Sequence, residues 1–147
     1  MTERTERLAL PIIAPGQAQK EMAHNEALAL IDLAVQASVE AVGLEAPPPD
    51  PEPGRCWIVG NAPVGAWAGR AGAIAGWTAG GWRFVAPRPG LAAWSVADGM
   101  EVRCDGSGWR QGAAIAAPAG GGTMDTEARA TLTAILAALR VHGLIAS

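Results

Sequence analysis

The first part of the chain has the spacing of polar positions that is typical of a long helix. Between Gln17 and Gly43, polar residues recur four or seven positions apart, and apolar residues fill most positions between them. The recurring polar residues are Glu21, Asn25, Asp32, Gln36 and Glu40. On a helix this spacing gives one narrow polar stripe on an otherwise apolar surface. We therefore predict an extended arm over 1–16 and an N-terminal helix over 17–43 that is buried on more than one side.

The middle of the chain changes to short apolar runs separated by glycine. Five prolines in "GLEAPPPDPEPG" predict a stiff linker over 44–54. From 55 to 112, the runs "RCWIV", "GAWAG", "GAIAGW", "WRFVAP", "LAAWSV" and "MEVRC" have the length and composition of strands. The segments Trp77 to Arg83 and Cys104 to Arg110 form a weak repeat, each with Trp-Arg after a glycine-containing turn. Because such turns favour hairpins, we predict a meander or a small barrel.

The last part of the chain predicts a second helix. A Gly/Ala spacer over 113–123 leads into a helix over 124–147, with Asp125 as its N-cap and Gly143 as its stop. One face repeats large side chains at the four-three spacing of a coiled coil. Its members are Ala128, Leu132, Ile135, Leu139 and His142. Since a helix this short is marginal alone, it must pack on its own β domain or, as the spacer favours, on helices of other copies.

These elements together predict an α+β fold: a long N-terminal helix, a small Trp-rich antiparallel β domain and a C-terminal heptad helix for oligomerisation. A net charge of -3 with scattered arginines argues against binding to nucleic acid. No apolar run approaches the ~18–20 residues of a transmembrane helix, and the first residues lack the features of a signal peptide. Cys56 and Cys104 belong to no Cys-x-x-Cys motif, and we expect reduced, buried thiols rather than a disulfide.

Glu21 and His24 form the strongest candidate for chemistry, because their spacing places both side chains on one helix face. A di-metal bundle needs the same step on a second helix, but the C-terminal helix offers only Glu127 and His142, fifteen residues apart. The sequence also has no nucleophile elbow. We therefore expect no catalytic residue, no metal and no cofactor. His142 either caps its helix or forms a ring of imidazoles around a symmetry axis.

All six tryptophans lie in the predicted β domain. A domain of this size is short of core, so the rings are expected to fill the interior of the sheet, with indole N–H groups bonded to turn carbonyls. The alternative is that a few rings are exposed as a platform for stacking sugars. The candidates for such a platform are Trp67, Trp77 and Trp82.

The segments "LPIIAPGQAQKEMAHNEALALIDLAVQASV", "GAWAG...IAGW...GWRFVAPRPGLAAW" and "MDTEARATLTAILAALRVHGLIAS" resemble a domain family of unknown biochemistry. This family occurs in tail-fibre and head-spike proteins of alphaproteobacterial phages and gene transfer agents. The resemblance runs from about Leu8 to Ser147, and its most specific block contains the Asn25-Glu26 signature. It favours His24, Asn25 and Glu26 as anchors of the helix to the arm or to a neighbouring subunit, rather than as metal ligands.

The resemblance implies a structural virion protein, a head-spike or fibre base that links the particle to a separate host-attachment fibre. The expected partners are further copies in a trimer or pentamer, a capsid or tail protein and a fibre or spike protein. The expected location is the phage-like particle, assembled in the bacterial cytoplasm. The predicted oligomer interface is formed by Leu28, Ile31, Val35, Leu132, Ile135, Leu139 and His142. The alternative is a carbohydrate-binding module that docks to host capsular polysaccharide through exposed tryptophans.

Overall fold

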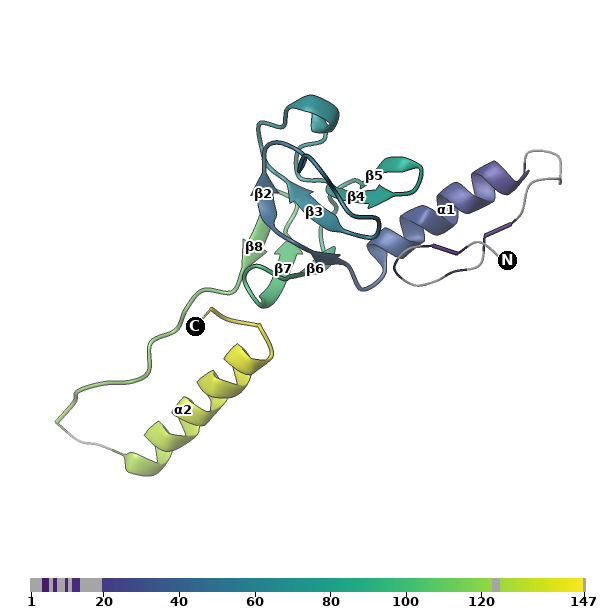
Figure 1. Ribbon diagram of the computed structural model, residues 1–147. Coiled ribbons are helices and arrows are strands. Elements are labelled where there is room, and N and C mark those ends of the chain that lie inside the picture. The colour runs from purple at the N-terminus through teal and green to yellow at the C-terminus, as the bar shows by residue number, and fades with distance from the viewer. Residues whose placement is uncertain are drawn as a thin grey trace.

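Two helices project from opposite sides of a small β domain (Figure 1). The structure is a computed structural model that describes residues 4, 5, 7, 10, 12–13, 20–122 and 125–146. Most of the arm predicted over 1–16 therefore lies outside the described residues. The elements are α1 (Lys20–Ala34), β1 (Ser38–Val39), β2 (Val42–Leu44), β3 (Cys56–Val59), the 3-10 helix η1 (Gly65–Trp67), β4 (Ile74–Thr78), β5 (Gly81–Val85), β6 (Ala92–Ser95), β7 (Met100–Cys104), β8 (Trp109–Gln111) and α2 (Thr126–Val141).

The strands form two four-stranded sheets that share one plan. One sheet has the order β2-β3-β4-β5 and the other β1-β6-β7-β8. In each, the first pair is parallel and the remaining pairs are antiparallel. Trp82 pairs with Trp77 across one hairpin, and Trp109 pairs with Cys104 across the other. The repeat predicted from the sequence is therefore a structural repeat, and the α+β class is confirmed.

The two sheets meet along the chain segment 37–44. On one side of this segment, Trp94 N–H donates to the Ala37 carbonyl at 2.8 Å. On the other side, Glu40 N–H donates to the Cys56 carbonyl at 2.8 Å. The prediction of a helix as far as residue 43 is therefore wrong. Ala37 and Val39 are buried, whereas their neighbours Ser38 and Glu40 are half-buried, and this alternation is the periodicity of a strand. In the sequence, the apolar run is too short for its pattern to distinguish a strand from a helix.

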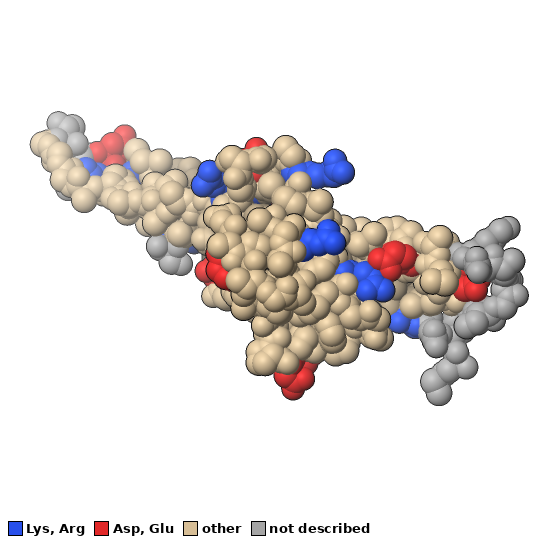
Figure 2. Space-filling model, turned by 90° about the horizontal axis from the view of Figure 1, so that it is seen from above, with Lys and Arg blue, Asp and Glu red and all other residues tan. Residues whose placement is uncertain are grey.

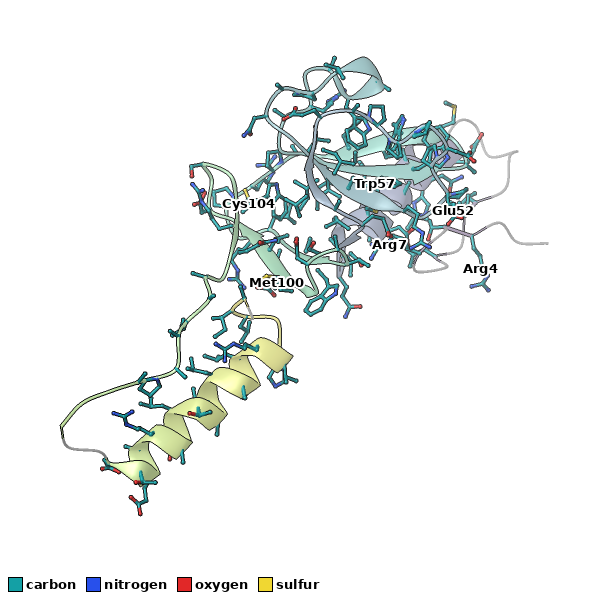
Figure 3. All side chains as sticks on the ribbon, turned by 60° about the vertical axis from the view of Figure 1, so that its left-hand side comes forward. Arg4, Arg7, Glu52, Trp57, Met100 and Cys104 are labelled. Atoms are coloured by element: carbon teal, nitrogen blue, oxygen red, sulfur yellow. The ribbon has the colours of Figure 1, made fainter. Side chains whose placement is uncertain are left out.

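Arg7 closes the end of α1. Its guanidinium donates to the carbonyls of Asp32, Leu33 at 3.4 Å and Gln36 at 2.8 Å, while its backbone N–H donates to the Asp32 carboxylate at 2.9 Å. The last carbonyls of a helix have no partner within the helix, and here the arm supplies one. Figure 3 labels Arg7 in this position. Gln36, with a φ of 47°, then turns the chain toward β1.

The core between the sheets is aliphatic and closely packed. Its buried members are Leu33, Ala37, Val39, Cys56, Ile58, Ile74, Ala93 and Val102. A Cβ on Gly76 would lie 2.3 Å from the Leu33 side chain, so this strand position must be glycine for α1 to reach the sheet. Cys56 and Cys104 are free and buried, as predicted. Burial raises the pKa of the Cys56 thiol to about 11, so the thiol stays neutral and packs as a small apolar group at physiological pH.

Two further segments differ in detail from the predicted elements. The run "GAWAG" is not a strand, because Gly65 has a φ of 61° and begins η1, which turns Trp67 into the interior. The Pro-rich segment joins two parallel neighbours, β2 and β3, within one sheet. Gly54 N–H donates to the Trp77 carbonyl at 2.8 Å and ties the end of this segment to β4.

Candidate functional site

The base of α2 is clamped to the β1-β6-β7-β8 sheet by two glycines. Glu101 N–H donates to the Gly143 carbonyl at 2.9 Å, and Ala146 N–H donates to the Gly112 carbonyl at 3.0 Å. A Cβ on Gly112 would lie 1.9 Å from the Leu144 carbonyl oxygen, and one on Gly143 would lie 2.6 Å from the Trp94 ring. Figure 3 labels Met100, which lies where the chain returns from α2 to the sheet. Only glycine allows this close approach of the two backbones.

The caps of α2 agree with the sequence. The Asp125 carboxylate accepts from Ala128 N–H at 2.8 Å. At the other end, Gly143 N–H donates to the Arg140 carbonyl and Leu144 N–H donates to the Leu139 carbonyl, both at 2.9 Å. This pair of hydrogen bonds is a Schellman motif, which ends the helix. The predicted N-cap and glycine stop are therefore confirmed, although the helix spans Thr126–Val141 rather than the whole of 124–147.

The spacer before α2 lies against one side of the helix. Arg129 donates to the carbonyls of Pro118 at 3.3 Å and Gly120, and Arg140 donates to the carbonyl of Ile115 at 2.6 Å. On the same side, Leu136 is buried. Two arginines eleven positions apart fall on one helix face, and here they hold the spacer as a second, extended layer. The spacer over 113–122 is thus attached to the helix along its length.

The predicted heptad face of α2 points to solvent. Leu132 and Ile135 are 48% and 49% exposed. His142 is exposed as the C-cap residue, and Leu139 is half-buried near the clamp. The structure thus brings these residues onto one open apolar face, and no described segment of the chain covers it.

One of the predicted interface residues on α1, Ile31, lines an apolar groove that the sequence did not reveal. Ile31 and Val35 are both 47% exposed, and Leu28 is half-buried. The groove lies beside them, between α1 and the chain at and after β5, with a volume of about 380 Å³. Its lining residues are Leu30, Ile31, Ala34, Phe84, Val85, Ala86, Arg88 and Leu91. Residues from α1 and from the β5 region meet only in the fold, so no local pattern marks the groove.

Asn25 anchors α1 to the arm, as predicted, whereas Glu26 anchors it to β5 of the same chain. The Asn25 amide accepts from Ile13 N–H and donates to the Ile13 carbonyl, both at 3.0 Å, which fixes the arm to the helix. The Glu26 carboxylate pairs with Arg83 of β5 at 2.7 Å. His24 is exposed. Within the described part of the chain, no group of three His, Cys, Asp or Glu side chains is arranged to hold a metal ion.

Five aromatic rings cluster on the outer face of the β2-β3-β4-β5 sheet. They belong to Trp57, Trp67, Trp77, Trp82 and Phe84. The Trp82 ring makes edge contacts with Trp67 and Trp77, with centroids 5.2 and 5.0 Å apart. Trp67 is fully buried, so its proposed role in sugar stacking is wrong: it fills the cluster beneath the other rings. Trp77 and Trp82 are half-buried at the surface.

A larger hollow of about 690 Å³ lies between the β3–β4 loop and the β7–β8 hairpin. Trp109 Nε1–H donates across it to the Gly72 carbonyl at 2.8 Å, as predicted for an indole beside a turn. Arg110, at its edge, pairs with Asp105 at 2.9 Å. The Arg110 guanidinium and the Ser107 hydroxyl hold the pKa of Asp105 well below its usual range. The two charges therefore satisfy each other, and none of the described residues that line the hollow carries an unpaired charge.

Charged side chains of both signs are scattered over the face seen in Figure 2, and uncharged surface makes up most of that face. The described helices include none with the length and apolar character needed to cross a membrane. The features that stand out are therefore apolar: the open face of α2 and the groove beside α1.

These features define a class: a two-sheet α+β domain that carries a clamped, outward-projecting helix. Residues 24–110, from α1 to β8, match the model of a family described as protein of unknown function (DUF2793). The chain belongs to this family. The match contains the groove beside α1, whereas α2 and its spacer lie outside the matched residues. No curated protein matches the chain significantly.

Proposed function

We propose that this chain is a non-enzymatic structural component of a phage-like particle or gene transfer agent, acting as a head-spike or fibre base. It joins a capsid or tail protein to a separate host-attachment fibre and assembles as a symmetric trimer or pentamer. The observation that carries the proposal is the open apolar face of α2, held away from the β domain by the clamp at Gly112 and Gly143. The resemblance of the sequence to tail-fibre and head-spike proteins supports this setting.

Self-association follows from the cost of leaving this face in water. An exposed apolar stripe on a projecting helix is typical of a protein interaction site. The spacer covers the neighbouring side of α2, where Arg129 and Arg140 hold it, and leaves the face of Leu132 and Ile135 open to a partner. Leu132 and Ile135 are already about half covered, so burying the rest of each would contribute roughly half of the about 1.5–3 kcal/mol that full burial of such a side chain gives. Symmetric assembly multiplies that gain by the number of copies.

The test is the size of the protein in solution. The wild-type chain at micromolar concentration should show a multiple of the chain mass in light scattering after size exclusion. Leu132→Asp should weaken assembly about thirtyfold or more, the effect of losing ~2 kcal/mol at an interface.

The matched control for this test is Ala130→Asp, which adds the same charge at an exposed position on another side of α2 and should assemble like the wild type. A wild-type protein that is a folded monomer at all concentrations would contradict the proposal.

A second candidate function is a carbohydrate-binding module for host capsular polysaccharide. It is favoured by Trp77 and Trp82, which remain partly exposed on neighbouring positions of the β4–β5 hairpin. On this hypothesis, host capsular polysaccharide gives a saturable change in intrinsic tryptophan fluorescence, because sugar covers the two rings. Trp82→Phe should reduce that change by at least half. If the fluorescence of the wild-type protein does not change during the titration, the carbohydrate-binding function is wrong and only the structural role is left.

A further inference from the structure

The groove between α1 and the β5 region is built to receive apolar side chains. Its volume of about 380 Å³ is well above the ~150 Å³ that accommodates a benzene ring. Leu30 and Phe84 contribute to its walls, and Ile31 stands at its rim with 47% of its surface exposed. Arg88 also borders it, and the Arg88 guanidinium has no ion pair with any described residue.

The open face of α2 matches this groove in apolar character and in charge. Leu132 and Ile135 stand next to each other on one face of a helix of 16 residues, about 24 Å long. The N-terminal end of α2 carries Asp125 and Glu127, which are opposite in charge to Arg88. The two arginines of α2, Arg129 and Arg140, are turned to the spacer and are therefore not set against Arg88.

The two surfaces of one chain do not meet. The clamp at Gly112 and Gly143 fixes the base of α2 to the second sheet. Figure 1 shows α2 projecting from the opposite side of the β domain to α1. A contact between the groove and α2 must therefore join different copies.

We propose that α2 of one copy docks through Leu132 and Ile135 into the α1–β5 groove of the next copy. This inference rests on the proposed function and specifies how the copies meet. Each chain then offers one helix and one groove, and the contact is head-to-tail rather than a bundle of α2 helices around an axis. A head-to-tail contact closes into a ring when its rotation is a simple fraction of a turn, which is the arrangement that a trimer or pentamer needs.

The experiment is a complementation test with two single variants. Ile31→Asp places a carboxylate at the groove and leaves α2 intact, whereas Leu132→Asp alters α2 and leaves the groove intact. Each variant alone should be monomeric in light scattering at micromolar concentration. An equimolar mixture should form a dimer and no larger species, because only one working helix and one working groove meet. Native mass spectrometry with one variant labelled with ¹⁵N should show one labelled and one unlabelled chain.

Controls make each outcome decisive. Far-UV circular dichroism and thermal unfolding verify that each variant is folded, and Ile31→Ser replaces Ile31→Asp if the aspartate variant unfolds. Met22→Asp, at a position of α1 that is 74% exposed and lies outside the groove, should assemble normally. If the groove variant assembles like the wild type, or if two monomeric variants stay monomeric when mixed, the head-to-tail contact is wrong while self-assembly through α2 stands. A monomeric wild type would overturn both proposals.

Discussion

Replacing Trp67 with alanine is expected to lower the free energy of unfolding by about 3–5 kcal/mol, the usual cost of removing a buried Trp. Trp67 has no exposed surface, and the centroid of its ring lies 6.4 Å from that of Trp57 and 5.2 Å from that of Trp82. Trp67 fills the interior of the aromatic cluster, so its truncation leaves a cavity that the surrounding rings cannot close. Because a small domain is stable by only ~5–15 kcal/mol in total, this loss is a large part of the whole.

Chemical unfolding followed by far-UV circular dichroism measures this effect without relying on tryptophan emission. The matched control is Trp94→Ala, since Trp94 is 41% exposed and lies outside the cluster; it should cost about 1 kcal/mol. Trp67→Phe should retain most of the stability, because it keeps a ring in the cluster and removes an indole N–H that has no partner among the described atoms. Equal unfolding midpoints for Trp67→Ala and Trp94→Ala would contradict this role of Trp67.

Gly112→Ala is expected to release the base of α2 from the sheet. The new Cβ would lie 1.9 Å from the Leu144 carbonyl oxygen, so the returning segment must move and lose the hydrogen bond from Ala146 N–H to the Gly112 carbonyl. Such overpacking typically costs ~1–3 kcal/mol. Hydrogen exchange of the Ala146 amide should therefore accelerate about tenfold or more, since each 1.4 kcal/mol is a factor of ten.

Gly108→Ala is the control for this prediction, because nothing lies within 4 Å of a Cβ built there. Its exchange pattern should match that of the wild type. Limited proteolysis of the spacer should also become faster in Gly112→Ala alone, because the spacer and α2 depend on the clamp for their position. Unchanged protection of residues 143–146 in Gly112→Ala would show that the clamp does not hold the helix.

The end of α1 shows where a local pattern stops being informative. Residues 35–43 continue the polar spacing of the helix, yet Arg7 closes the helix after Ala34 and the following segment pairs with β3 and β6. A short run of alanine and valine fits either a helix or a strand. This segment is a strand because it pairs with residues distant along the chain. Trp94, for example, is more than 50 residues away, and its N–H donates to the Ala37 carbonyl.

The amino-acid sequence by itself determined the strands of both hairpins, the caps of α2 and the spacing of its apolar face. These features depend on residues within a few positions of one another, as glycine turns, N-caps and Schellman stops do. Only the tertiary structure decided that Trp67 turns inward, that Gly112 and Gly143 fix the base of α2 to the sheet, and that Ile31 borders a groove with Phe84. Each of these depends on contacts between distant segments, which no local pattern records.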